Sequence, residues 1–172
     1  DQTYARLVEH FSAYARALDD YTDAQFEAKP SPEAWSLGQL YEHLLASARG
    51  LFGKKISACL THQYGQVGGE MNERGQQLFA NDGFPPIKIR PPEQYRGPDP
   101  MAQSRDAYRV AFAQVLADLE SQAGQMAHDD GSYKAGHAVF GMLNAHQWLR
   151  AFEMHTRHHF RQKAELDTFL KQ

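Results

Sequence analysis

Three of the chain's nine histidines fall within five residues of the segment MHTRHHFRQ, which runs from Met154 to Gln162. Two of them, His155 and His159, are four residues apart. On a helix, residues with this spacing lie one above the other on the same face. Neutral imidazole is a favoured ligand of zinc, nickel and iron, and such a pair offers two adjacent coordination positions. The segment therefore indicates either metal chemistry or two ordinary core histidines.

The pair lies on a stripe of apolar residues. The other residues of this stripe, at helical spacing, are Trp148, Leu149, Phe152, Leu166, Phe169 and Leu170. A single buried histidine commonly satisfies its nitrogens with carbonyl or water partners. Two imidazoles one turn apart would repel each other if both were protonated in a buried setting, whereas one divalent cation satisfies both. His158 and His146 point away from the stripe, so we expect them at the surface or at an edge between helices.

A metal site of this kind needs a third protein ligand, which must come from another helix. Gln162 lies near the edge of the stripe but is a weak ligand for such metals, and Glu153 is displaced from the stripe. His43 lies on the edge of the apolar stripe of its own helix, where a side chain can reach a gap between helices. From the residues alone, His10 and His137 remain alternatives, and so does a partly exposed His43 that binds nothing.

Four stretches with helical spacing of apolar residues must position these side chains. The predicted helices cover Tyr4 to Leu18, Leu37 to about Leu60, Pro100 to about Gly124, and Ala145 to about Leu170. Ser36 and Asn144 each precede a helix and are followed three residues later by glutamine, which is the pattern of a capping box. Asp99 before Pro100 predicts the start of the third helix.

The connection between the second and third predicted helices, residues 65–98, is rich in glycine and proline, with one short helix expected near Gln76 to Ala80. Loops of this length commonly cover a site or join distant ends of a bundle, although a mobile surface loop fits equally. A polar linker is predicted from Gln125 to Lys134, and no stretch alternates as a strand should. We therefore predict one all-α domain over residues 1–172, a four-helix bundle with a long connection between helices two and three.

The composition of the chain limits the kinds of binding partner that we expect. The chain has 172 residues, 42% of them apolar, and a formal charge of −3 with acids and bases interspersed. Neither a basic face for nucleic acid nor an apolar run that could span a bilayer is present, so we expect no nucleic acid or membrane partner. Cys59 is the single cysteine, which excludes an internal disulfide and fits a cytoplasmic location. We expect Cys59 to be a core residue.

The order of several short motifs resembles the DinB/YfiT-like superfamily of metal-binding four-helix bundles. The motifs are Trp35-Ser36-Leu37-Gly38-Gln39-Leu40, Glu42-His43-Leu44, Ala138-Val139-Phe140-Gly141, Gln147-Trp148-Leu149 and His155 to Gln162. The family often has proline where Ala138 stands, and residues 65–98 match only loosely. The resemblance implies that His43, His155 and His159 are the metal ligands.

Three histidine ligands leave a coordination position open, as in catalytic sites. The superfamily includes enzymes that transfer bacillithiol or mycothiol groups. The resemblance therefore implies a small-thiol S-transferase with a metal-activated thiolate. The alternatives are a metal-dependent hydrolase and a non-catalytic metal-binding stress protein. The cofactor would be zinc or nickel, with iron also acceptable. The expected partners are a small-molecule substrate and a low-molecular-weight thiol, and a homodimer is compatible with the sequence.

No general base for hydrolysis is marked in the sequence. Glu42 precedes His43 and points about 100° aside, so we expect it at the surface. Arg157 and Arg161 are four residues apart on the last helix. They could orient an anionic cosubstrate, and an exposed charged face explains them equally well.

Overall fold

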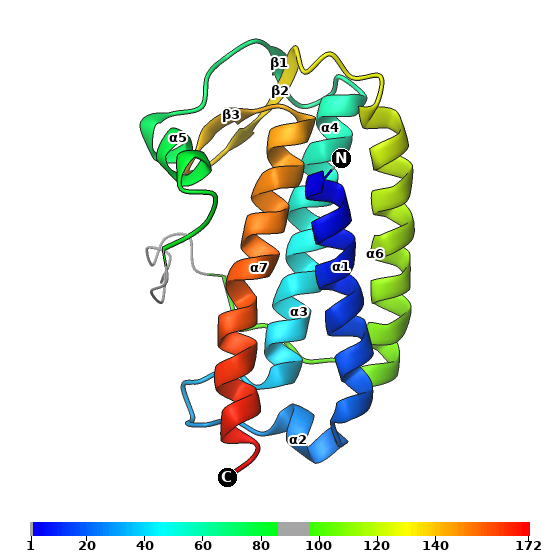
Figure 1. Cartoon of the computed structure of the whole chain (residues 1–172), viewed down its shortest axis with the longest axis vertical. Coiled ribbons are helices and arrows are strands. Elements are labelled where there is room, and N and C mark those ends of the chain that lie inside the picture. Colours follow the sequence, from blue (N-terminus) through cyan, green and yellow to red (C-terminus); the bar gives the residue numbers. More distant parts are fainter. Residues whose placement is uncertain (1, 86–96) are drawn as a thin grey trace.

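The computed structural model describes residues 2–85 and 97–172, most of which are helical (Figure 1). The long helical segments are α1 (Gln2–Ala17), α3 (Leu37–Ser47), α4 (Lys54–Leu60), α6 (Arg105–Met126) and α7 (Ala145–Phe169). A π-helical turn, η2 (Ala48–Gly53), joins α3 and α4 into one continuous rod. The segments lie side by side, with α1 and α7 running in one direction and the α3–α4 rod and α6 in the other.

Two of the predicted helix starts are confirmed because their capping boxes form. The Oγ of Ser36 accepts from the N–H of Gln39, whose side chain accepts from the N–H of Ser36 in return. Asn144 and Gln147 make the same reciprocal pair at the start of α7. Each box satisfies backbone donors that the first helical turn leaves free. These caps set where the helices bearing the three candidate histidines begin.

The predicted start of the third helix is wrong. The helix α6 begins at Arg105, and Ser104 is its N-cap. Asp99 instead accepts a hydrogen bond from the indole Nε1 of Trp35 at 3.1 Å. A long-range partner thus takes the carboxylate that the sequence pattern assigned to a cap.

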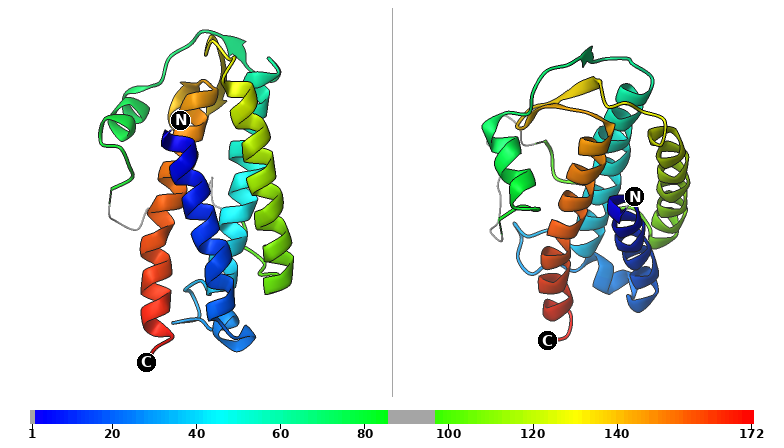
Figure 2. Two further views of the ribbon diagram at one scale, coloured as in Figure 1. Left: turned by 45° about the vertical axis from the view of Figure 1, so that its right-hand side comes forward. Right: turned by 45° about the horizontal axis from the view of Figure 1, so that its top comes forward.

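A small antiparallel sheet stands at one end of the helices, and the sequence did not predict it (Figure 2). Its strands, in spatial order, are β1 (Gln66–Val67), β2 (Tyr133–His137) and β3 (Gly141–Leu143). Strands this short carry too few residues for alternation to be recognised. The all-α prediction therefore holds for most of the described chain, and the predicted polar linker ends in β2.

The remaining short helices are η1 (Leu18–Asp20), α2 (Asp23–Glu27) and α5 (Glu73–Ala80). The short helix expected near Gln76 is α5, which starts earlier because Asn72 caps it. The described part of the predicted 65–98 connection leaves α4 at the sheet end and passes through α5 along the outside of α7 (Figure 1). Because α6 begins at the opposite end, the connection is a crossover. Residues 86–96 of this prediction lie outside the described residues.

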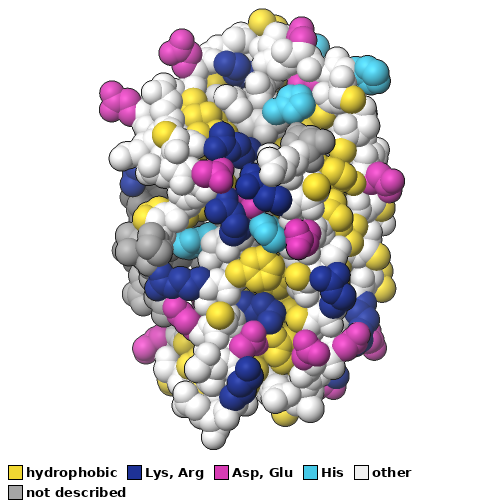
Figure 3. All heavy atoms as spheres, in the orientation of Figure 1, with side chains coloured by type: hydrophobic (Ala, Val, Ile, Leu, Met, Phe, Trp, Pro, Cys, Tyr) yellow, Lys and Arg dark blue, Asp and Glu magenta, His cyan; other side chains and the backbone are white. Residues whose placement is uncertain are grey.

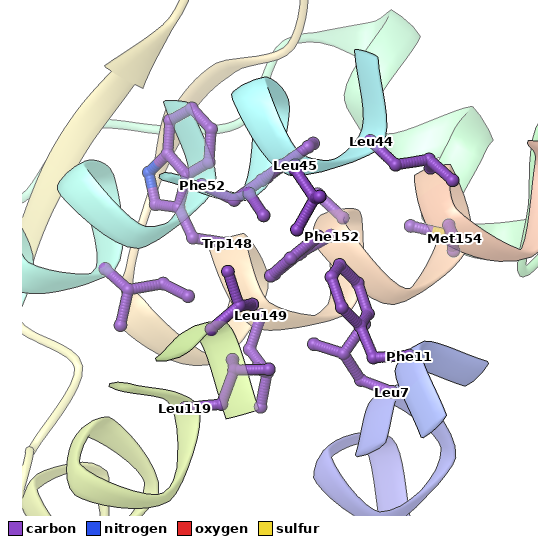
Figure 4. Packing of buried hydrophobic residues seen from close by; sticks show 14 of the residues in the cluster. Leu7, Phe11, Leu44, Leu45, Phe52, Leu119, Trp148, Leu149, Phe152 and Met154 are labelled. Carbon is purple, nitrogen blue, oxygen red and sulfur yellow. The ribbon is translucent and has the colours of Figure 1, made fainter. Parts of the chain in front are cut away.

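A continuous core fills the space between the long helices (Figure 4). Phe11 of α1 packs edge-on against Phe152 of α7 and against Phe112 of α6, at ring centroid distances of 5.3 Å and 5.5 Å. Burying a side chain of this size contributes about 1.5–3 kcal/mol. Trp148 is fully buried and donates from Nε1 to the carbonyl of Ala135, which ties α7 to the sheet. Across residues 2–85 and 97–172, none of the helices has the length and apolar character needed to cross a bilayer.

Candidate metal centre

The Nε2 atoms of His43, His155 and His159 converge between α3 and α7. The nitrogen of His43 lies 3.2 Å from that of His155 and 3.1 Å from that of His159, and the latter two are 3.3 Å apart. His43 is 112 residues from His155 in the chain. In the part of the chain that the structure describes, this is the one group of histidine, cysteine or acidic side chains whose ligand atoms meet in this way.

Helical spacing and helix packing together produce this triangle. His155 and His159 are one turn apart on α7, so their rings face the same neighbour. That neighbour is α3, which packs against α7 and presents His43. The ring of Phe52, from η2, lies 5.2 Å from the ring of His155 and backs the site on its inner side.

Burial keeps the three imidazoles neutral. It lowers the pKa of His43 to about 4 and, together with the neighbouring His43, that of His159 to about 3. Burial and the other two imidazoles hold the pKa of His155 well below 6.5. Near pH 7 the rings are therefore uncharged, which is the state in which imidazole binds metals.

The nitrogen triangle fits a bound metal ion. Imidazole nitrogens at about 2.0–2.1 Å from a tetrahedral ion lie about 3.3–3.4 Å apart, and 90° angles bring them to about 3.0 Å. The observed separations of 3.1–3.3 Å fall across this range. They accommodate a divalent ion without selecting one geometry.

A hydrogen bond fixes which nitrogen of His159 faces the triangle. Its Nδ1 lies 3.1 Å from the Oε1 of Gln162, an acceptor, so Nδ1 carries the proton and Nε2 presents its lone pair. Three nitrogens this close can share few protons, and their lone pairs repel. A cation relieves this repulsion, so the three histidines could hold a metal ion.

Aromatic rings border the triangle. The indole of Trp35 lies 5.2 Å from the ring of His43. Phe84 lies 5.4 Å from the ring of His158, which itself lies 5.5 Å from the ring of His159. A hollow of about 200 Å³ adjoins this side and is lined by Gly83, Phe84, Met154, Arg157, His158 and Arg161. The neighbours of the imidazoles are thus aromatic, and the hollow that adjoins the site is basic.

The other candidate histidines lie away from the triangle. His10 packs edge-on against Phe160, and its Nδ1 is 3.6 Å from a carboxylate oxygen of Glu153. His137 stacks on Phe140 and accepts from the backbone N–H groups of residues 139 and 140. As expected, His146 is exposed and His158 is half-buried.

Sequence reasoning missed the burial of Glu153. Its side chain is fully buried, and its two oxygens accept from Nε and Nη2 of Arg157 at 2.9 Å and 3.1 Å. Arg157 also donates to the carbonyl of Asp82, whose carboxylate pairs with Arg150 at 3.0 Å. Figure 3 shows basic side chains gathered around acidic ones in the middle of the face over α7 and α1. The spacing of four between Glu153 and Arg157 was the available signal.

The remaining predicted residues have less direct roles. Arg161 pairs with Glu165 at 3.3 Å and lines the basic hollow together with Arg157. Cys59 is fully buried, as expected, and its thiol donates to the carbonyl of Leu143. Burial raises the pKa of this thiol, so it is unsuited to nucleophilic chemistry. Glu42 is half-buried and is not part of the histidine cluster.

One protein family matches most of the chain. The family model of the DinB superfamily matches residues 6–162. The match includes the three converging histidines and all the long helices apart from their outermost residues. No curated protein matches the chain.

Proposed function

The chain belongs to the DinB superfamily, and from this premise we propose that it is a divalent-metal-dependent enzyme that transfers a small thiol to an electrophilic substrate. The observation that carries the proposal is the convergence of three neutral Nε2 atoms within 3.3 Å of one another. The helices α1, α6 and α7 and the α3–α4 rod likewise support the four-helix-bundle architecture and a single domain over residues 1–172.

His43, His155 and His159 would hold the ion through Nε2. Three protein ligands leave at least one coordination position for substrate, which is the arrangement of catalytic rather than structural sites. When bound, a zinc or nickel ion supplies Lewis acidity that lowers the pKa of a coordinating thiol and makes it a nucleophile at neutral pH. Iron also accepts imidazole ligands, so the donor set alone does not choose among these metals.

Other side chains have supporting roles. Gln162 holds the His159 ring with Nε2 directed at the other two nitrogens. The rings of Trp35 and Phe52 flank the triangle and give the imidazoles apolar neighbours. The hollow lined by His158 and Arg161 favours a thiol that carries an anionic group, because arginine pairs well with carboxylates and phosphates.

Hydrolysis is the weaker candidate. A metal-dependent hydrolase needs a base that receives a proton from the bound water. Among the described residues, no aspartate or glutamate joins the three histidines. A thiol that arrives as cosubstrate needs no nucleophile from the protein, which agrees with the burial of Cys59.

Metal analysis followed by a conjugation assay tests the proposal. The purified protein, as isolated and after reconstitution with zinc or nickel, is incubated with an aryl halide and bacillithiol, mycothiol or glutathione. We expect metal-dependent thioether formation that His155→Ala abolishes and that the exposed His128→Ala leaves unchanged. Ester or amide turnover without thiol would instead identify a hydrolase. Tight metal binding with neither activity would leave a metal-binding stress protein.

A cytoplasmic location and a homodimer remain predictions from the sequence. Light scattering on the metal-loaded protein would decide the oligomeric state.

Arg161→Gln should raise the KM for the thiol more than it lowers kcat, because the arginine is proposed to bind the thiol's anionic group and not the reacting sulfur.

A further inference from the structure

A groove of about 670 Å³ lies between the α3–α4 rod and α6. The rod contributes Ala48, Arg49, Lys54 and Ala58 to its lining, and α6 contributes Val115 and Leu119. Pockets that bind small molecules commonly have volumes of about 300–1,000 Å³. The groove is therefore large enough for a small organic ligand.

The floor of the groove is apolar. Ala58, Val115, Leu119 and Phe152 line it, and all four belong to the buried core. Leu119 and Phe152 are labelled among the packed core residues in Figure 4. A ligand that enters the groove therefore meets hydrocarbon at the bottom, where an alkyl or aryl group is favoured over water.

The rim on the side of the rod is cationic. Arg49 and Lys54 both line the groove and are exposed. No carboxylate within residues 2–85 and 97–172 lies within 4.0 Å of either cation. Asp118 lines the opposite wall on α6, where it accepts from the side-chain amide of Gln114 at 2.8 Å. Within the described residues, the two cations thus border an apolar floor without a carboxylate partner.

The π-helical turn lies at the groove. Arg49 is within η2, Lys54 is the residue directly after it, and both line the groove. In an α-helix, residues five apart point about 140° away from each other. A π-helical turn reduces this angle, and such turns are frequent at functional sites.

The surroundings support the turn. A Cβ on Gly53 would lie 2.9 Å from the carbonyl oxygen of Ala48, so glycine is favoured there. The Nε2 of Gln122 on α6 donates to the carbonyl of Gly53 at 3.0 Å. This side chain satisfies a carbonyl at the end of η2 and joins the two walls of the groove.

We propose that this groove is a second binding site, which takes an amphiphilic organic anion such as a medium-chain carboxylate. The alkyl chain lies on the floor formed by Leu119 and Phe152, and the carboxylate pairs with Arg49 and Lys54. An apolar floor selects a hydrocarbon group, and two cations at its edge, which pair with no carboxylate in the described part of the chain, select an anionic head.

The proposed site does not depend on the metal centre. The ring of Phe152 stacks on that of Phe52 at 4.8 Å with an interplanar angle of 5°, and Phe52 in turn lies against His155. Two stacked rings therefore stand between the groove and the nearest candidate ligand. Binding in the groove should be the same in metal-free and metal-loaded protein.

Calorimetric titration of the chelator-treated full chain with sodium octanoate tests the proposal. We expect saturable binding with one site per chain. The double variant Arg49→Gln/Lys54→Gln should weaken this binding about tenfold or more, because it removes both charge-assisted hydrogen bonds. The matched control Lys29→Gln/Lys171→Gln makes the same change in net charge at exposed positions far from the groove and should bind octanoate as the wild type does.

Two further measurements locate the ligand. Octylammonium and 1-octanol carry an alkyl chain of similar length without an anionic head and should bind about tenfold more weakly or not at all. Ser57→Trp, at an exposed position on the lining, fills the groove and should abolish octanoate binding while circular dichroism shows a folded protein.

The proposal is overturned if octanoate shows no saturable binding, or if the Arg49/Lys54 variant binds it as tightly as the control variant. It is equally overturned if binding requires added zinc and is lost in His155→Ala, since the carboxylate would then be coordinating at the histidines. None of these results depends on whether the protein transfers thiols.

Discussion

The Nδ1 of His159 and the Oε1 of Gln162 lie 3.1 Å apart, three residues from each other on α7. This contact sets the ring so that its Nε2 faces His43 and His155. Partners of this kind matter because they fix the tautomer and orientation of a ligand that they do not replace. Gln162 is a weak metal ligand by chemistry, and the structure shows that it contacts a candidate ligand instead.

Replacing Gln162 should therefore weaken metal binding without abolishing it. We expect Gln162→Leu to lower zinc affinity about 10–100-fold, the usual cost of losing such a partner. Gln162→Glu, which keeps an acceptor, should restore most of the affinity. Competition with a chromogenic chelator measures both, and Gln125→Leu on the exposed side of α6 is the control. Equal affinity in Gln162→Leu and wild type would show that the contact has no orienting role.

Removal of the metal should lower thermal stability. An ion that binds only the folded state stabilises it by about 2.7 kcal/mol at one hundred times its Kd. For a chain of this size that corresponds to a shift in Tm of about 5–10 °C. Scanning calorimetry with zinc and with chelator checks this shift. His43→Ala should show no difference between the two conditions, whereas His10→Ala should still respond to zinc, because His10 lies outside the triangle.

The pair of buried Glu153 and partly buried Arg157 should be costly to break. We expect Glu153→Ala to lower the free energy of unfolding by about 1–3 kcal/mol, because Arg157 loses its main partner and keeps only its contacts with Asp82. The exposed pair of Arg161 and Glu165 is the matched comparison, since its spacing is the same and both side chains are 48% exposed. Glu165→Ala should cost about 1 kcal/mol or less in urea denaturation. Similar losses in the two variants would contradict the importance assigned to burial.

Lowering the pH should reduce the stability of the fold, because His137 is buried in its neutral form. Burial, with a smaller effect of Lys55, lowers the pKa of this residue to about 4, below its ordinary value of 6.5. The unfolded chain therefore binds a proton that the folded chain excludes between pH 6.5 and about 4. Stability due to neutral His137 is complete above pH 6.5 and is lost as the pH falls through this window.

The variant His137→Asn isolates this effect in metal-free protein. Asparagine can still accept from the backbone N–H groups of residues 139 and 140 but does not titrate. The stability advantage of wild type over His137→Asn should shrink by about 2 kcal/mol between pH 7 and pH 5. A difference that stays constant over this range in urea titrations would show that His137 is not shielded from protons.

Features that depend on neighbouring residues were predictable from the sequence. The capping boxes at Ser36 and Asn144 and the paired faces of His155 and His159 involve residues three or four apart, so helical geometry alone specifies them. The residues by themselves left the third histidine open between His43, His10 and His137. Resemblance to a family selected His43, and the structure brings that side chain to the other two.

Other features were decided only by tertiary contacts. Asp99 bonds to Trp35 instead of capping α6, and Glu153 is buried where it contacts His10 of α1. For each of these residues the sequence is compatible with both local and distant partners. Tertiary packing determines which of them the side chain contacts. The sheet depends on the same kind of contact, since β1 pairs with a strand far along the chain. Local spacing therefore determined the helices and the histidine pair, while the packing of distant segments determined the completed triangle, the buried ion pair and the groove.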